Sequence, residues 1–442
     1  MPTAAFTTLG CKVNQYETQK ILESFELKGF RIVSFDSPAD VYVINSCSVT
    51  HTAESKSRYA ARKAARSNPD SIVVITGCAS QMAHNKGETL ELAHVMVPNQ
   101  DKLDTISYLL KSYPELEQRL IEEPAPLNSP KLSRRTRATV KVQDGCNIYC
   151  SYCSIPYTRP VRSSRAWDEV VDEVKHLAAE GFKEVVLTGV LIGNYGEETG
   201  SGGPDLPELI EEVAKIDGIE RIRLSSIETT DVSDKLLDTM KRTPKICPHL
   251  HIPLQSGDDR ILEAMNRPYS RDYFIKKCKE VIAAIPDMAI TTDILVGFPG
   301  EDEVAFNNTC EVVEEVGFLR GHIFRFSPRP GTPAAVMVNC TSEADKEERS
   351  KRLIELCQQT GNAYITNYLG RDMRVLVERK SSKSGLLSGH TDNYIEVHFA
   401  GSSSLCGELA NVRLMQKANE IQLGELAAKP LKESRYERLC VL

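Results

Sequence analysis

Three cysteines that lie close together in the sequence are suited to binding a metal cluster. Cys146, Cys150 and Cys153 stand in the segment DGCNIYCSYC with the spacing C-x-x-x-C-x-x-C. Thiolates suit zinc or an iron-sulfur cluster. Zinc usually takes a fourth protein ligand, and no Cys or His follows at a suitable local spacing. The spacing therefore favours a [4Fe-4S] cluster with one iron open to a cofactor, over a zinc knuckle or buried structural cysteines.

Three other cysteines each follow a predicted strand. Cys11, Cys47 and Cys78 stand in TTLGCK, VINSCS and VITGCA, at spacings of 36 and 31 residues. Each spacing matches one βα repeat of about thirty residues, so three successive strands would place these cysteines at one edge of a parallel sheet. A single cysteine at a strand end is more often structural. Three in register predict a second cluster, again with one open iron.

The first hundred residues alternate short apolar runs with polar helical stretches, which predicts a parallel sheet covered by helices. The expected strands are 4–9, 41–45, 72–76 and 94–97, and the expected helices are 14–28, 52–67, 80–92 and 101–111. This N-terminal α/β domain is expected over residues 1–120. Residues 121–137, rich in Pro, Ser and charge, are expected to form a linker.

A second alternating region follows the linker. Strands are expected at 138–142, 184–188, 221–225, 249–254, 289–296 and 322–326, with a closing helix over 343–367. Six strands separated by helices predict a partial (β/α)6 barrel over residues 138–368, and Cys146 follows its first strand, where such barrels place their chemistry. Short β-rich pieces after Gly370 predict a small β-barrel over residues 369–434, followed by a tail, 435–442.

The length, charge and amino-acid composition of the chain exclude some classes of protein. The chain has 442 residues, a net charge of −7 and 26% charged residues. These values describe an ordinary globular chain and exclude a generally cationic nucleic-acid coat protein. Neither a secretory signal nor an apolar stretch of membrane-spanning length is recognisable, so we expect a cytoplasmic protein without a membrane partner.

The C-x-x-x-C-x-x-C motif resembles that of the radical S-adenosylmethionine enzymes. In that family the open iron binds the cofactor, and an electron from the cluster cleaves it to a 5′-deoxyadenosyl radical. Tyr152 matches the aromatic residue that often precedes the third cysteine, so the resemblance implies a cofactor contact there. The resemblance implies cofactor contacts at Thr188 and Gly189, after the next strand. Gln255 and Asp293, at the ends of later strands, would face the same barrel mouth. Each of these polar residues has a purely structural alternative.

The whole chain resembles the methylthiotransferases, whose N-terminal domain carries an auxiliary cluster and whose C-terminal β-barrel is called TRAM. Matching blocks stand in the expected order, namely LGCKVNQYET, INSCSVT, GCASQ, HIPLQSGDDRILEAMNR, DILVGFPGE and SPRPGTPA. The first block is similar to the branch that acts on N6-threonylcarbamoyladenosine at tRNA position 37. One departure is Pro160, where relatives often have glycine, so a backbone contact at that position is not carried over.

This resemblance implies a reaction and its cofactors. One S-adenosylmethionine would methylate a sulfur on the Cys11/Cys47/Cys78 cluster, and a second would be cleaved at the Cys146/Cys150/Cys153 cluster to activate C2 of the adenine. The implied partners are a tRNA anticodon loop and a reductant such as flavodoxin or ferredoxin. The alternatives are methylthiolation of isopentenyladenosine 37 or of a ribosomal-protein aspartate, and a non-catalytic iron-sulfur protein that binds RNA.

Local basic patches are the candidates for RNA contact. Arg58, Arg62 and Arg66 recur at four-residue spacing in the expected helix 52–67, where they would share one face. A solvated charged face is the alternative. A second group lies near the cysteine motif and would contact RNA phosphate or the cofactor. This group consists of Arg159, Arg162 and Arg165.

Overall fold

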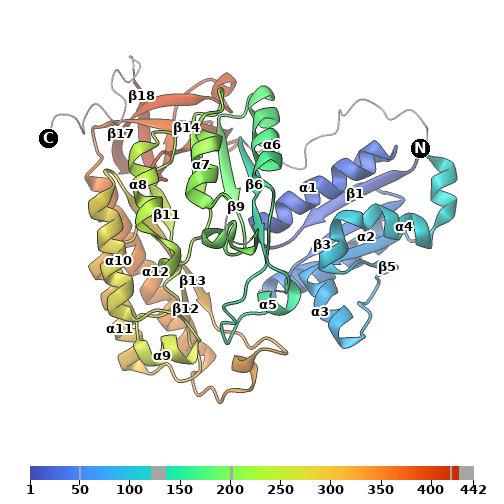
Figure 1. Cartoon of the computed structure of the whole chain (residues 1–442), viewed down its shortest axis with the longest axis horizontal. Helices are drawn as coiled ribbons and strands as arrows, with labels where there is room; N and C mark the ends of the chain where they lie inside the picture. Colours follow the sequence, from blue (N-terminus) through green and yellow to red (C-terminus); the bar gives the residue numbers. More distant parts are fainter. Residues whose placement is uncertain (49–50, 121–135, 200–202, 419–420, 428–442) are drawn as a thin grey trace. The chain divides into compact units, whose positions relative to one another are not determined.

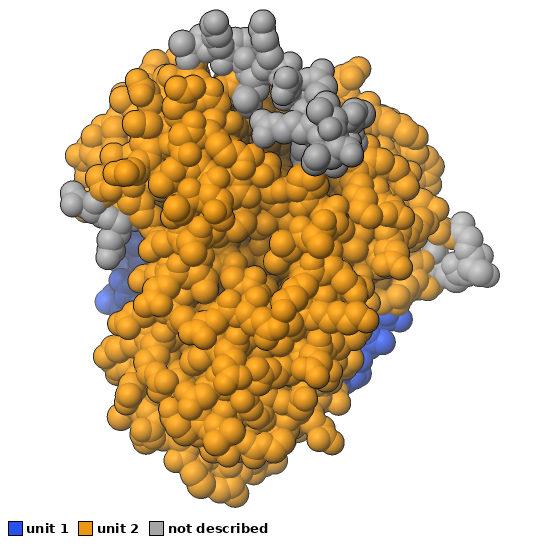
Figure 2. Space-filling model, turned by 90° about the vertical axis from the view of Figure 1, so that its left-hand side faces the viewer, with its two compact units in different colours: residues 1–134, 145–162, 329–332 blue, residues 135–144, 163–328, 333–442 orange. Residues whose placement is uncertain are grey.

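The structure is a computed structural model in which residues 1–48, 51–120, 136–199, 203–418 and 421–427 are described. The chain divides into two compact units (Figure 2). Unit 1 comprises Met1–Arg134, Gly145–Arg162 and Arg329–Thr332, and unit 2 comprises Arg135–Asp144, Ser163–Pro328 and Pro333–Leu442. The segment with Cys146, Cys150 and Cys153 thus belongs to the same unit as Cys11, Cys47 and Cys78. Most of the expected linker and the whole expected tail lie outside the described residues.

Unit 1 contains a five-stranded parallel sheet in the order β2-β1-β3-β4-β5 (Figure 1). The strands are β1 (Thr3–Thr8), β2 (Arg31–Val33), β3 (Val41–Ser46), β4 (Ile72–Gly77) and β5 (Val95–Met96), and the helices are α1 (Lys12–Leu27), α2 (His51–Ser67), α3 (Cys78–Lys86) and α4 (Thr105–Ser112). The central strands are rich in Val and Ile because both of their faces are buried. Their alternate side chains pack in two separate cores.

Helices cover both faces of this sheet. On one face, Phe6 and Val43 pack with Ile21 and Phe25 of α1 and with Leu109 of α4. On the other face, Tyr42 and Ile44 pack with Ala60, Ala61 and Ala64 of α2. The result is a three-layer α/β/α arrangement, which confirms the expected parallel α/β domain.

Unit 2 contains six parallel strands in two sets. These are β6 (Arg137–Lys141), β9 (Glu184–Thr188), β10 (Arg221–Leu224), β11 (His249–His251), β12 (Ala289–Val296) and β13 (Arg320–Arg325). Strands β6, β9 and β10 form one sheet and β11, β12 and β13 the other. Two parallel bridges, Ile222 to Ile246 and Ser226 to His251, join the two sheets. The six strands therefore form the expected partial barrel.

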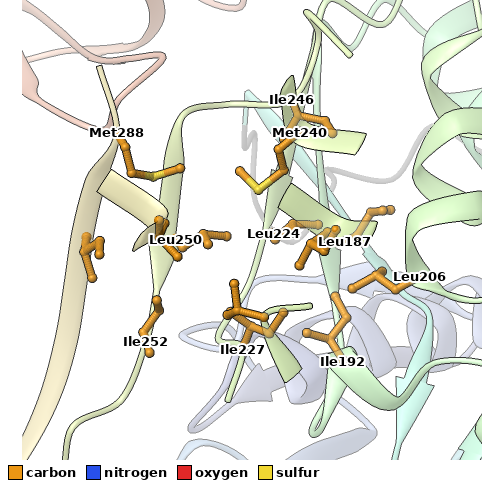
Figure 3. Close-up of a cluster of buried hydrophobic side chains, with 14 of the residues drawn as sticks. Leu187, Ile192, Leu206, Leu224, Ile227, Met240, Ile246, Leu250, Ile252 and Met288 are labelled. Carbon is orange, nitrogen blue, oxygen red and sulfur yellow. The ribbon is translucent and has the colours of Figure 1, made fainter. Parts of the chain in front are cut away.

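Helices follow the strands of this barrel and enclose its core. They are α6 (Trp167–Ala179), α7 (Leu206–Ala214), α8 (Asp234–Arg242), α9 (Asp259–Ala264), α10 (Arg271–Ala284), α11 (Glu303–Val316) and α12 (Glu343–Thr366). Figure 3 shows part of the core, where Leu187, Leu224 and Leu250 come from three different strands. Side-chain caps fix several helix starts, including a capping box of Asp205 and Glu208 at α7. These helices hold the strand ends in place.

The C-terminal part of unit 2 is a closed five-stranded barrel in the order β14-β15-β16-β18-β17. Its strands are β14 (Asp372–Lys380), β15 (Leu387–Thr391), β16 (Glu396–Phe399), β17 (Leu409–Ala418) and β18 (Ile421–Leu426). Val375, Leu387 and Val397 are among its fully buried side chains. The small β-barrel predicted from the sequence is confirmed. The exact domain boundaries stay a prediction.

A buried ion network joins the (β/α)6 barrel to this small β-barrel. The Glu184 carboxylate lies 2.8 Å from Arg221 Nε and 2.9 Å from Arg223 Nε. Arg221 also donates to the carbonyl oxygens of His390 and Thr391, at 3.1 and 2.9 Å. Glu184 and Arg221 stand at the first positions of β9 and β10. The network therefore lies at the amino end of the strands, opposite the end where residues such as Thr188 and Gly189 lie.

Candidate metal centres

The first cysteine set occupies one edge of the sheet of unit 1. Cys47 and Cys78 come directly after β3 and β4, and Cys11 is the N-cap of α1, three residues after β1. These strands are neighbours in the sheet, and Ser46 pairs with Gly77 at the end of β3 and β4. Because the strands are parallel, their carboxyl ends meet at one edge. The structure thus places the three cysteines on that edge, as the strand-end spacing predicts.

Two glycines allow the cysteine turns to approach one another closely. Gly10 has φ +93°, and a Cβ there would lie 2.6 Å from Cys47 Sγ. Gly77 has φ +92°, and a Cβ there would lie 2.4 Å from the carbonyl oxygen of Ser46. Both backbone conformations are ones that side chains rarely adopt. The Gly-Cys pairs in LGC and TGC therefore have a steric reason.

Asn14 ties the first two cysteine turns together. Its side-chain Nδ2 donates to the carbonyl oxygens of Leu9 and Ser46, at 2.9 and 3.1 Å. Its own carbonyl oxygen accepts from Asn45 Nδ2 at 2.9 Å. The residue is fully buried. One amide side chain thus fixes the backbone before Cys11 and the backbone before Cys47 at the same time.

The second cysteine set lies on the loop that precedes the short helix α5 (Ile155–Thr158). The loop turns at Gly145, with φ +78°, and at Tyr149, with φ +54°. Backbone amides approach two sulfurs: Ile148 N lies 3.5 Å from Cys146 Sγ, and Ile155 N lies 3.4 Å from Cys153 Sγ. Amides directed at cysteine sulfur are one means by which proteins tune iron-sulfur clusters. Tyr152, the predicted cofactor contact on this loop, is half-buried.

In neither cysteine set do the three sulfur atoms lie close enough together to bind a single metal ion. A tetrahedral zinc ion with bonds of about 2.3 Å holds its sulfurs about 3.8 Å apart. Within the described ranges, the one group with three ligand atoms all within 4.8 Å of one another is His251, Asp293 and His322. The wider separation of the thiols, with three donors in each set, fits a [4Fe-4S] cube better than a zinc knuckle.

The other predicted cofactor residues lie in the barrel of unit 2. Thr188 is the last residue of β9 and is buried, and Gly189 follows it. Gln255 has φ +62°, and its backbone amide donates to the carbonyl oxygen of Asp293 at 2.9 Å. Asp293 is the fifth of eight residues in β12, so the prediction that it stands at the end of a strand is wrong. Gln255 and Asp293 are nevertheless brought together.

Sequence reasoning missed three polar side chains in this unit. The buried Gln143 accepts through Oε1 from the amides of Val190 and Leu191, at 3.1 and 2.7 Å, and so shapes the turn after β9. His251 Nε2 lies 3.2 Å from Asp293 Oδ1, and His322 pairs with Asp293 in the register of β12 and β13. The alternation of side chains along neighbouring strands could have revealed this cluster, because His251 and Asp293 share one face.

The predicted RNA-contacting arginines have different environments. Arg58, Arg62 and Arg66 are exposed on α2, and Arg58 and Arg62 make surface ion pairs with Glu54 and Glu91. In the second group, Arg162 is half-buried in unit 1. Arg165, in unit 2, lies 2.6 Å from Glu173. These five side chains all retain some exposure.

Arg159 departs from the expectation. It is 3% exposed, and its guanidinium donates to both carboxylate oxygens of Glu17, at 2.9 and 2.8 Å. Glu17 also accepts from Lys102 Nζ at 2.5 Å. In unit 1 as described, Arg159 therefore belongs to an internal ion network and is not presented to RNA. No sequence pattern indicates this burial, because charged residues are rarely fully buried.

A cavity of about 180 Å³ lies in unit 1, beside residues that neighbour cysteines of both sets. Its lining includes Ser48 and Ser154, each next to a cysteine, together with Met82 and Arg329. Burial lowers the pKa of Arg329, against the influence of Glu54, 3.7 Å away. Arg329, in the SPRPG block, was not singled out from the sequence. The cavity gives unit 1 a partly apolar recess lined by three cationic side chains, those of Arg58, Lys86 and Arg329.

Family models and relatives cover nearly the whole chain. The model of the radical SAM superfamily matches residues 140–313, and that of the uncharacterized protein family UPF0004 matches residues 3–97. The threonylcarbamoyladenosine tRNA methylthiotransferase MtaB of Bacillus subtilis is 36% identical over 430 residues, 94% of each chain. The chain belongs to the methylthiotransferase family of radical S-adenosylmethionine enzymes. The resemblance drawn from the sequence is confirmed.

Other relatives of this methylthiotransferase bear the names of two different tRNA-modifying activities. The MtaB of Thermotoga maritima is 37% identical, with 95% of this chain and 96% of that protein covered. The tRNA-2-methylthio-N(6)-dimethylallyladenosine synthase of Acetivibrio thermocellus is 34% identical, with coverages of 92% and 87%. The radical S-adenosylmethionine methyltransferase TsrM of Kitasatospora setae has a similar fold, with a TM-score of 0.55 at 14% identity over 76% of this chain and 75% of that one.

Family membership brings S-adenosylmethionine and [4Fe-4S] clusters as the cofactors of this methylthiotransferase. The donor sets fit them, since each set offers three thiols. None of the helices in the described residues is long and apolar enough to cross a lipid bilayer.

Proposed function

We propose that this methylthiotransferase transfers a methylthio group to C2 of N6-threonylcarbamoyladenosine at position 37 of tRNA. The observation that carries the proposal is the pair of three-cysteine sets in a chain that is 35 to 37% identical to four relatives bearing that activity in their names. The LGCKVNQYET block adds support, because it is similar to the same branch.

The six cysteines have separate assignments in this proposal. Cys146, Cys150 and Cys153 would hold the radical cluster, and Cys11, Cys47 and Cys78 would hold the auxiliary cluster. When bound, these groups supply reductive cleavage of S-adenosylmethionine and a site for the sulfur to be transferred. Such chemistry suits the target, because an aromatic C–H bond has neither acidity nor a leaving group. The chain's own contribution is to position the reactants and exclude water.

The remaining predicted residues bind and orient. Thr188, Gly189, Gln255 and Asp293 would contact S-adenosylmethionine in the barrel, and Tyr152 would do so from the cysteine loop. Arg58, Arg62 and Arg66 would contact phosphates of the anticodon arm, since their exposed guanidinium groups share one helix face. An anticodon-loop base is already single-stranded, so turning it into a site costs at most a few kcal/mol.

The proposal also covers the cellular setting. A low-potential reductant such as flavodoxin or ferredoxin would deliver the electron, and the protein would work in the cytoplasm, where tRNA is modified. The relatives' names support tRNA as the substrate.

Analysis of tRNA nucleosides tests this function. Protein reconstituted under anaerobic conditions is incubated with S-adenosylmethionine, dithionite and tRNA bearing either threonylcarbamoyladenosine or isopentenyladenosine at position 37. We expect a mass gain of one methylthio group on the former alone. Methylthiolation of isopentenyladenosine instead would assign the chain to the other tRNA branch, and product found only in ribosomal-protein digests would assign it to the third branch.

A substitution at a cysteine outside both sets is the control. The Cys406→Ala variant removes an exposed thiol of the small β-barrel and should retain full activity. If neither the parent nor this variant forms 5′-deoxyadenosine from the cofactor, the non-catalytic alternative replaces the proposal.

A further inference from the structure

Unit 1 contains a buried group of three charged side chains. Glu17 on α1 contacts Arg159, with Nη2 at 2.8 Å, and Lys102, with Nζ at 2.5 Å. The side chains of Glu17, Arg159 and Lys102 are between 1 and 3% exposed. Burial lowers the pKa of Lys102, against the influence of the Glu17 carboxylate. With both basic groups protonated, the three side chains carry a formal charge of +1. We call them the buried cation network.

Arg159, one member of this network, is the C-cap of α5, the short helix that follows the loop carrying Cys153. Asn85 Nδ2 donates to the carbonyl oxygen of Tyr157, and Asn99 Nδ2 donates to that of Thr158, both at 2.9 Å. These bonds fix the backbone directly before Arg159. The guanidinium is therefore held inside unit 1 from its main chain as well as by Glu17.

The network extends to the other cysteine set. Arg159 Nη2 donates to Asn14 Oδ1 at 2.9 Å, and Asn14 in turn holds the turns before Cys11 and Cys47. A single side chain, that of Asn14, therefore links the guanidinium of Arg159 to the turns before Cys11 and Cys47.

Burying a net charge is costly unless an opposite charge lies nearby. A [4Fe-4S] cluster on three thiolates carries a formal charge of about −1 when oxidised and about −2 when reduced. Nearby positive charge stabilises the more negative state. It therefore favours reduction of the cluster.

We propose that the buried cation network of Glu17, Lys102 and Arg159 raises the reduction potential of the auxiliary cluster. The inference rests on the proposed function, which assigns that cluster to Cys11, Cys47 and Cys78. These three charged residues are positioning residues, because they act on the cluster through space and not as its ligands. Reduction adds one electron to the cluster, supplied by the low-potential reductant.

The test is a redox titration of the auxiliary cluster alone. The full chain with Cys146, Cys150 and Cys153 all changed to alanine is reconstituted anaerobically and titrated with dithionite, with the reduced cluster followed by electron paramagnetic resonance. Lys102→Met removes one cation and should lower the ratio of reduced to oxidised cluster at a fixed potential by about tenfold, which is about 59 mV for a one-electron couple. Glu17→Gln removes the anion and should shift the ratio in the opposite direction.

Matched controls isolate the charge. Lys102→Arg keeps the charge and should leave the potential unchanged, and Lys111→Met removes an exposed charge of α4 and should also leave it unchanged. If Lys102→Met loses the cluster while Lys102→Arg keeps it, the comparison of Glu17→Gln with the parent decides, and equal potentials in those two proteins would overturn the inference. Equal potentials in Lys102→Met and the parent, or equal cluster loss in both Lys102 variants, would overturn the inference. Absence of any cluster in the parent would instead contradict the proposed function.

Discussion

Cys150 and Cys47 belong to different cysteine sets, so their substitutions should separate two parts of the reaction. Cys150→Ala removes a ligand of the radical cluster and should abolish both cofactor cleavage and methylthiolation. Cys47→Ala removes a ligand of the auxiliary cluster and should leave some uncoupled formation of 5′-deoxyadenosine without modified tRNA. Chromatography of 5′-deoxyadenosine and of tRNA nucleosides measures both results. Equal retention of modified tRNA in the two variants would refute the assignment.

Asp231 gives the barrel a pH dependence of stability. Burial, reinforced by Glu228, raises the pKa of Asp231 from its ordinary value to about 6. The neutral carboxyl group therefore stabilises the folded state below about pH 4, and that contribution is lost as the pH rises through about 6. Asp231→Asn should accordingly raise the free energy of unfolding by about 1 to 2 kcal/mol at pH 8, with no gain near pH 4.

Chemical denaturation at the two pH values measures this effect. Asp238→Asn, at an exposed position on α8, is the control and should not reproduce the gain at pH 8. A gain for Asp231→Asn that is equal at both pH values would show that the carboxyl charge is not responsible.

The positions of single residues could be predicted where a regular spacing in the sequence determined them. The strand-end cysteines could be placed on one edge because Cys11, Cys47 and Cys78 recur with the βα repeat. Arg159 could not be placed, because its burial depends on Glu17, 142 positions away in the sequence. Pairings between residues so far apart leave no periodic signal in a single sequence.

Among the elements, β9 and β10 depend on the Glu184 network. Although burial acts to raise it, Arg221, Arg223 and Arg137 hold the pKa of Glu184 at about 2. Because the folded-state pKa lies below the ordinary value, the stabilisation is complete above about pH 4.5 and is lost as the pH falls toward 2. Glu184→Gln should lower the free energy of unfolding by about 3 to 5 kcal/mol at pH 7, since it leaves buried arginines without their carboxylate.

Urea denaturation between pH 7 and pH 3 tests this prediction. The difference between Glu184→Gln and the parent should shrink toward the acidic end. Glu220→Gln, at an exposed position just before β10, should cost less than about 0.5 kcal/mol. A pH-independent difference for Glu184→Gln would show that packing, and not charge, accounts for the loss.

The α2 helix is the element we expect to contact tRNA. Changing Arg58, Arg62 and Arg66 to alanine should weaken tRNA binding and reduce its salt dependence, by up to about 0.7 to 0.9 in the slope of log K against log salt for each phosphate that is no longer neutralised. Binding titrations at several salt concentrations measure both. A matched triple on α8, Lys235, Lys241 and Arg242 to alanine, removes the same charge elsewhere. Equal weakening in the two triples would show only a general effect of net charge.

Most elements were predictable from hydrophobic patterning, and the exceptions have local causes. Strands β9 and β12 have the predicted bounds, because apolar and β-branched runs mark them clearly. The predicted helix 80–92 instead ends as α3 at Lys86, since Gly87 adopts the left-handed conformation with φ +67°. Strand β2, three residues long at an edge of the sheet, was not predicted.

For the whole molecule, the order of α/β domain, partial barrel and small β-barrel could be predicted, because each has its own periodicity. Which residues belong to each compact unit could not be predicted. The structure groups residues 145–162 with the N-terminal residues in unit 1, although the sequence places them after the first barrel strand. Contacts such as that of Asn99 with Thr158 account for this grouping, and they too join distant positions.

The central claim is that this methylthiotransferase holds two [4Fe-4S] clusters, one on each set of three cysteines. Iron and acid-labile sulfide per chain, measured after anaerobic reconstitution, test it most directly. We predict about eight irons for the parent and about four when Cys11, Cys47 and Cys78 are all changed to alanine. About four irons in the parent itself, unchanged by that triple substitution, would contradict the two-cluster assignment.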